Sequence, residues 1–142
     1  MTITTDRKIE LLGTVALFDG IGLDGLAAVA EQVEEVDFPA GRPIVRQGEI
    51  GTGFYLITAG RTRVVRDGET LAELGPGEFF GELSLLDGEP RIAAVVSETP
   101  TTCLAIPSWK FDTLLESQPR LTIAILRGVA RRLRNVTEEH RH

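Results

Sequence analysis

The feature that most constrains the fold is a series of short β-like segments between residues 35 and 106. Seven stretches of β-branched and apolar residues alternate with turns that contain glycine or proline, and ten of the fifteen glycines lie from Gly41 to Gly88. The Asp67-Gly68 pair between two such stretches predicts a two-residue hairpin. Short, evenly spaced strands with these turns are typical of an antiparallel sandwich, jelly roll or small barrel.

Helical periodicity lies on both sides of this β region. Residues 7–33 predict two helices, the second with Asp24 as its N-cap. Residues 107–136 predict two more, separated by a break at 117–119, because a proline belongs in the first turn of a helix. We therefore expect residues 1–142 to form one domain, mainly β, with an antiparallel roll (a double-stranded β-helix) between N-terminal and C-terminal helices.

Composition argues against several classes of function. The net charge of -6 disfavours general nucleic-acid binding. No apolar run approaches the length that spans a bilayer, and the first ten residues lack a signal-like apolar segment, so we expect a cytoplasmic protein without membrane contact. The single cysteine, Cys103, lies in an apolar stretch and is predicted to be buried.

The sequence also lacks the residues that a metal site or nucleophilic catalysis would need. The only two histidines are His140 and His142, in a polar tail. A zinc or iron site takes two or three His or Cys ligands, and a Ser-His or Cys-His arrangement needs a histidine base in the core. We therefore expect neither a metal site nor an enzyme.

Residues 79–93 (FFGELSLLDGEPRIA) place opposite charges in an otherwise apolar run. Gly81 predicts a tight turn into a short helical turn, whose free N–H groups can bind an anion. Arg91 could direct its planar fork at the same anion. Glu82 would accept hydrogen bonds from sugar hydroxyls, so the segment suggests a ligand with a phosphate and a ribose.

Two simpler interpretations of the same residues stay open. Glu82 and Arg91 could pair with each other. Alternatively, Glu82 could stabilise the positive end of the helix while Arg91 lies at the surface.

The segment also resembles the phosphate-binding cassette of the cyclic nucleotide-binding domain. This family includes the bacterial catabolite activator protein, regulatory subunits of cAMP-dependent protein kinase and cyclic-nucleotide-gated channels. The similarity extends over nearly the whole chain. The similar motifs are FDGI (18–21), FPAG (38–41), IVRQG (44–48), FYLI with its following glycine (54–60), and LGPGEFFGELSLL with PR (74–91).

The resemblance implies a role for each matching residue. Glu82 would accept the ribose 2′-hydroxyl, and Gly81 would let the backbone approach the sugar. Arg91 would bind the exocyclic phosphate oxygens. The remaining implied contacts are the backbone N–H groups around Leu83, Ser84 and Ile92, and the side chains of Val64 and Leu71 as walls for the base.

Position 92 departs from the family pattern, which usually has Ala, Ser or Thr there. Ile92 keeps the backbone N–H but adds bulk beside the phosphate and base. It offers no hydroxyl to a guanine amino group, as a threonine would in the family. The resemblance therefore implies cAMP as the ligand, with cGMP the less favoured one.

These features predict a non-enzymatic sensor or regulatory module for a cyclic nucleotide that acts on an unidentified protein effector. One alternative is a degenerate domain that serves as a protein-interaction or dimerisation scaffold without nucleotide. A second is a DNA-binding regulator like the catabolite activator protein. That function needs a helix-turn-helix, and the chain stops about where one would begin, so we expect no direct DNA binding.

The final predicted helix carries an apolar stripe at helical spacing. Three arginines, Arg127, Arg131 and Arg134, form a separate basic face that is typical of a solvated surface. The stripe could pack on the chain's own roll, cover the nucleotide as a lid, or form a homodimer with the same helix of a second copy. Its residues are Leu126, Val129, Ala130, Leu133 and Val136.

Overall fold

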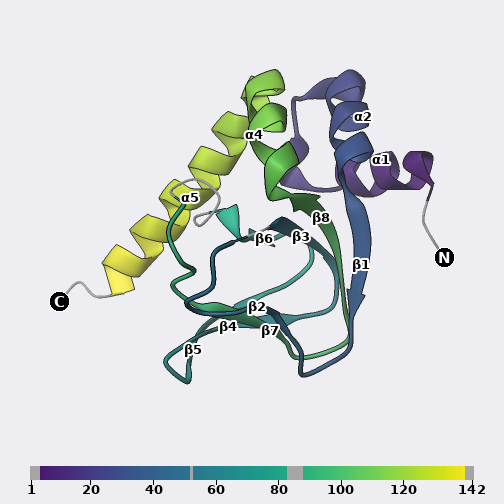
Figure 1. Ribbon diagram of the computed structural model, residues 1–142. Helices are drawn as coiled ribbons and strands as arrows, with labels where there is room; N and C mark the ends of the chain where they lie inside the picture. The colour runs from purple at the N-terminus through teal and green to yellow at the C-terminus, as the bar shows by residue number, and fades with distance from the viewer. Residues whose placement is uncertain (1–3, 52, 83–87, 140–142) are drawn as a thin grey trace.

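The computed structural model describes residues 4–51, 53–82 and 88–139 (Figure 1). Two antiparallel sheets form a roll, with helices packed at one end and along one side. The helices are α1 (Thr5–Gly13), the 3-10 turn η1 (Ala16–Phe18), α2 (Gly22–Gln32), α4 (Ser108–Ser117) and α5 (Pro119–Glu139). The strands are β1 (Glu34–Phe38), β2 (Pro43–Val45), β3 (Gly53–Ala59), β4 (Thr62–Arg66), β5 (Glu69–Leu74), β6 (Phe79–Phe80), β7 (Ala94–Ser97) and β8 (Thr101–Pro107). The predicted fold class is confirmed.

The strand orders are β1-β8-β3-β6 in one sheet and β2-β7-β4-β5 in the other. Strand β3 shows how two cores arise, because successive side chains of a strand point to opposite faces. Phe54 and Leu56 pack against the helices, whereas Ile57 packs between the two sheets. Cys103 lies in this second core, as predicted, and burial raises the pKa of its thiol to about 12.

The Asp67-Gly68 hairpin joins β4 to β5 as predicted. Both residues have positive φ, 52° and 83°, as the favoured two-residue hairpin turn requires. The Gln47 side chain holds the turn from outside: its Nε2 donates to Asp67 Oδ1 at 2.9 Å, and its Oε1 accepts from the Asp67 N–H at 3.0 Å.

The second N-terminal helix begins earlier than predicted. We expected Asp24 as the N-cap, but α2 begins at Gly22, with Ile21 in the cap position. Gly22 has a φ of +75°, a conformation open to glycine, and this lets the chain turn into the helix three residues sooner. Asp24 instead lies in the first turn, where its charge favours the helix N-terminus.

The predicted break between the C-terminal helices is confirmed, since α4 ends at Ser117 and α5 begins at Pro119. Helix α4 is anchored by a stack of three rings. Phe111 of α4 stacks on Phe54 of β3 with ring centroids 5.3 Å apart, and Phe54 stacks on Phe79 of β6 at 5.4 Å. Strand β6 was not foreseen, because two residues are too few to show a period.

Helix α5 runs along the outside of the roll (Figure 1). It buries Leu121 and Ile125 and packs Val129 against the core that lies between the roll and the helices. The rest of the expected apolar stripe does not pack on the roll: Leu126 is 57% exposed and Leu133 is 67% exposed. The side chain of Val136 lies outside the described part of the chain. No helix within the described residues is long and apolar enough to cross a membrane.

Candidate functional site

Gly81, directly after β6, brings two backbone segments into close approach. Its φ is +97°. A Cβ at this position would lie 2.6 Å from the carbonyl oxygen of Gly53 and 3.2 Å from Nη1 of Arg91. Any other residue would therefore have to displace backbone, and Gly81 is required here for both its conformation and its size.

Arg91 lies beside this turn and is only 9% exposed. Its Nη2 donates to the carbonyl oxygen of Gly53 at 3.1 Å, and among the described residues no carboxylate forms an ion pair with it. Burial lowers the pKa of the guanidinium from its usual value, although Tyr55, Glu82 and Glu49 oppose the shift. Arg91 is thus a desolvated cation that an anion would stabilise.

Glu82 is more deeply buried, at 3% exposed. Its Oε1 accepts a hydrogen bond from Nη1 of Arg132 at 2.9 Å. Its Oε2 is also buried and has no hydrogen-bond partner in the described part of the chain. An unsatisfied buried acceptor costs about 1–3 kcal/mol, and more when it is charged. A carboxylate oxygen in this state is a ready acceptor for a hydroxyl donor from a ligand.

This geometry decides between the interpretations of Glu82 and Arg91. The two residues do not pair with each other, because the ion-pair partner of Glu82 is Arg132. Arg91 does not lie at the surface either. The pairing of Glu82 with Arg91 is therefore wrong, and so is the surface position expected for Arg91. Arg91 and one oxygen of Glu82, Oε2, remain available to a third group.

Arg132 of α5 is the functional residue that sequence reasoning missed. Besides its contact with Glu82, Arg132 donates through Nη2 to the carbonyl oxygen of Phe79, and its guanidinium lies 4.4 Å from the centroid of the Phe79 ring. The structure places it on the face that α5 turns to the roll, seven residues after the buried Ile125 and three after Val129. An arginine on the buried face of an amphipathic helix needs an anionic or aromatic partner.

Gly128 explains why α5 can approach so closely. A Cβ on Gly128 would lie 2.7 Å from Cζ of Phe79, so the absence of a side chain lets the helix rest on this ring. Arg132 follows one turn later and extends over the same ring to Glu82. Together, Gly128 and Arg132 dock α5 beside the Gly81 turn.

The other predicted site residues are more scattered. Ile92 follows Arg91 and is 61% exposed, so its side chain projects from the surface and does not fill the core. Val64 and Leu71 lie on neighbouring strands β4 and β5 of the second sheet, with Leu71 at the point where their register shifts. The structure describes no contact from either of them to Gly81, Glu82 or Arg91.

Leu83 and Ser84, whose backbone N–H groups were expected to contact the ligand, lie outside the described residues. The structure therefore brings together Gly81, Glu82 and Arg91, and it adds Arg132 to them.

Gly81, Glu82 and Arg91 lie within a match to a known protein family. The family model of the cyclic nucleotide-binding domain matches residues 35–118. A CRP-like cAMP-activated global transcriptional regulator of Mycobacterium tuberculosis is 32% identical over 130 residues, which cover 88% of this chain and 58% of that protein. A cyclic nucleotide-gated potassium channel of Rhizobium etli is 34% identical over 119 residues, covering 84% of this chain and 33% of the channel.

A solved structure agrees with these matches. The catabolite activator protein of Thermus thermophilus superposes with a TM-score of 0.79 at 35% identity, covering 87% of this chain and 60% of that one. The chain spans between a third and three fifths of the lengths of these three relatives.

Proposed function

The chain belongs to the cyclic nucleotide-binding domain family, and from this premise we propose that it is a non-enzymatic cytoplasmic module that binds cAMP and regulates a protein effector. The observation that carries the proposal is the buried Oε2 of Glu82, which has no partner among the described residues. The neighbouring Gly81 turn also approaches a buried cation, Arg91, whose charge interacts with that of Glu82 but which has no ion-pair partner among the described residues. A ligand with a hydroxyl next to a phosphate satisfies both.

In this proposal each residue has a separate task. Arg91 binds the phosphate oxygens as a planar fork, and Oε2 of Glu82 accepts the ribose 2′-hydroxyl while Oε1 stays with Arg132. Gly81 admits the sugar to the turn. Further contacts come from the backbone N–H groups at Leu83, Ser84 and Ile92, with Val64 and Leu71 beside the base. A scaffold without nucleotide would need neither the unsatisfied oxygen nor the unpaired cation.

Direct measurement tests the proposal. Isothermal titration calorimetry of the purified chain is expected to show saturable binding of cAMP and weaker binding of cGMP. Ile92 lacks a hydroxyl for the guanine amino group, so Ile92→Thr should shift the preference toward cGMP. One new hydrogen bond corresponds to about a tenfold change in the affinity ratio.

Three other results would each correct this account. A wild-type preference for cGMP would show that residues other than Ile92 determine which base is recognised. Binding of cAMP only after Ile92→Ala would identify the bulk of the isoleucine as an obstacle. Binding of neither nucleotide by either protein would leave the scaffold as the better account.

We also propose that α5 is a lid over the nucleotide, so that cAMP binds best when this helix is docked. Gly128→Val should force α5 off the Phe79 ring, since overpacking costs about 1–3 kcal/mol, and should weaken cAMP binding by roughly tenfold. Hydrogen exchange should quicken across residues 126–133 in this variant, whereas cAMP should slow it in the wild type.

Asn135→Val is the matched control, because it adds the same β-branched side chain at an exposed position of the same helix. It should change neither the affinity for cAMP nor the hydrogen-exchange rate across residues 126–133 appreciably. If Gly128→Val binds cAMP as tightly as the wild type, α5 is not a lid.

The exposed part of α5 supports a homodimer. Ile123, Leu126, Ala130 and Leu133 are exposed and follow one another at intervals of three, four and three residues, the seam spacing of a coiled coil. We expect a concentration-dependent dimer in sedimentation velocity. Leu126→Glu should disrupt it, while Arg131→Glu, an exposed change at a position that points away from the seam, should not. A wild-type chain that stays monomeric at every concentration would contradict this proposal.

A further inference from the structure

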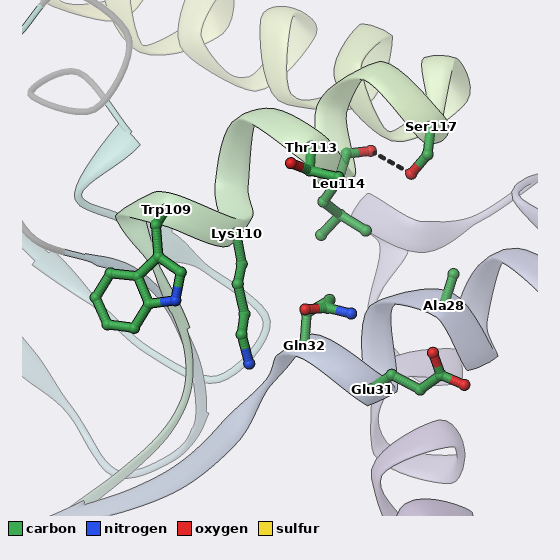
Figure 2. A pocket seen from close by; sticks show the side chains of 8 residues that line it. All are labelled: Ala28, Glu31, Gln32, Trp109, Lys110, Thr113, Leu114 and Ser117. Carbon is green, nitrogen blue, oxygen red and sulfur yellow. Dashed lines mark hydrogen bonds between the residues drawn. The ribbon is translucent and has the colours of Figure 1, made fainter.

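A groove between α2 and α4 (Figure 2) shares no lining residue with the site formed by Gly81, Glu82, Arg91 and Arg132. Its volume is about 190 Å³. Leu114, buried in the core, forms its floor. The remaining lining residues are Ala28, Glu31 and Gln32 of α2, and Trp109, Lys110, Thr113 and Ser117 of α4.

The size of the groove limits what can occupy it. Small-molecule sites usually measure about 300–1,000 Å³, so this groove is too small for a nucleotide or cofactor. It is of the right order for one large apolar side chain on the Leu114 floor. This favours a protein segment that inserts a single anchor residue.

Trp109 supplies a contact surface for such an anchor. Its side chain is 74% exposed at the edge of the groove. Isolated exposed apolar residues are common and mean little alone. This one adjoins a hollow lined by the same helix, and tryptophans beside pockets are over-represented among the residues that dominate binding energy.

Lys110 determines the charge of the partner. It is partly buried, and Figure 2 shows its chain extending into the groove toward Gln32. No carboxylate forms an ion pair with it among the described residues. Glu31 also lines the groove, but Figure 2 shows its carboxylate on the α2 side, away from the Lys110 ammonium. Because the chain as a whole carries a net charge of -6, an acidic group would be attracted here by this local cation and not by the overall charge.

We propose that the α2–α4 groove is a docking surface for a segment of a protein partner that inserts one large apolar side chain against Trp109 and Leu114 and places a neighbouring carboxylate on Lys110. The docking itself is independent of nucleotide binding.

The groove is also joined to the nucleotide site. Helix α4 carries Phe111, which stacks through Phe54 on Phe79, and Phe79 contacts Arg132. A partner that holds α4 therefore affects the ring against which α5 docks. If cAMP binds as proposed above, the two sites should influence each other's affinity reciprocally.

The single tryptophan of the chain makes the test specific, because its indole N–H gives one assignable NMR signal. The compound 3-phenylpropionate, an apolar ring with a carboxylate, represents the anchor and its acidic neighbour. It should shift the signals of Trp109, Thr113 and Ser117 with a dissociation constant on the order of 1 mM, as expected for a fragment of this size.

The neutral 3-phenylpropanamide should bind about two- to fivefold more weakly than the acid, and Lys110→Gln should remove that difference. Arg66→Gln, which removes an exposed cation on the distant β4–β5 hairpin, is the matched control and should leave the difference intact. Trp109→Ala should weaken both compounds, as followed through the amides of Thr113 and Ser117.

Absence of shifts at ten times the expected dissociation constant, or equal binding of acid and amide to the wild type, would overturn the proposal. Dilution-dependent shifts of the Trp109 signal without any compound would also overturn it, because the occupant would then be a second copy of the chain. Equal affinity with and without saturating cAMP would refute only the coupling.

Discussion

An Arg91→Ala variant is expected to lose between about thirtyfold and a few thousandfold of its affinity for cAMP. Removing one partner of a buried charge pair costs about 2–5 kcal/mol, and Arg91 is buried with no other ionic partner among the described residues. The phosphate would then be left desolvated without a counter-charge. Titration calorimetry on the wild type and the variant measures the loss directly.

Two controls separate binding from folding. Arg91 also donates to the Gly53 carbonyl, so the thermal unfolding midpoint of each variant should be compared without ligand. Arg91→Lys keeps the charge but loses the planar guanidinium that can donate two hydrogen bonds to a phosphate. It should recover only a small part of the affinity. If Arg91→Ala is folded and binds cAMP as well as the wild type, the phosphate does not bind at Arg91.

The second large effect is expected from the ligand itself. Replacing cAMP by 2′-deoxy-cAMP should weaken binding by about ten- to a hundredfold, because a hydrogen bond to a charged group contributes roughly 1.5–3 kcal/mol. The acceptor is the buried Oε2 of Glu82, which would return to its unsatisfied state. A single chemical group is removed and the protein is unchanged.

Glu82→Gln tests whether this carboxylate is the group responsible. The variant should reduce the difference in affinity between cAMP and its deoxy analogue, since the neutral amide is the weaker acceptor. Arg132→Gln provides a contrast. It removes the partner of Oε1 but should preserve most of the affinity difference between the two ligands. Equal binding of the two ligands by the wild type would show that Glu82 has a structural role only.

Sequence reasoning was most accurate where a residue's own conformation determines the structure. The Asp67-Gly68 hairpin, the break before Pro119 and the tight turn at Gly81 depend on backbone angles that few residues adopt. Such requirements can be read locally.

The failures have a common physical cause, which is contact between distant parts of the chain. Arg132 was overlooked because its partner Glu82 is fifty residues away. The apolar stripe of α5 was drawn as one surface, whereas Val129 faces the roll and Leu126 faces outward. The angle at which α5 docks sets this division, and it depends on Gly128 meeting Phe79.

The pairing of Glu82 with Arg132 has a consequence for anyone who treats the roll as a transferable part. Grafting residues 35–107 onto another protein would carry Gly81, Glu82 and Arg91 together. It would leave behind the helix that holds one oxygen of that carboxylate. Both oxygens of Glu82 would then need new donors, because the grafted roll would contain a buried carboxylate without hydrogen-bond partners. The smallest portable unit must therefore extend through residue 132.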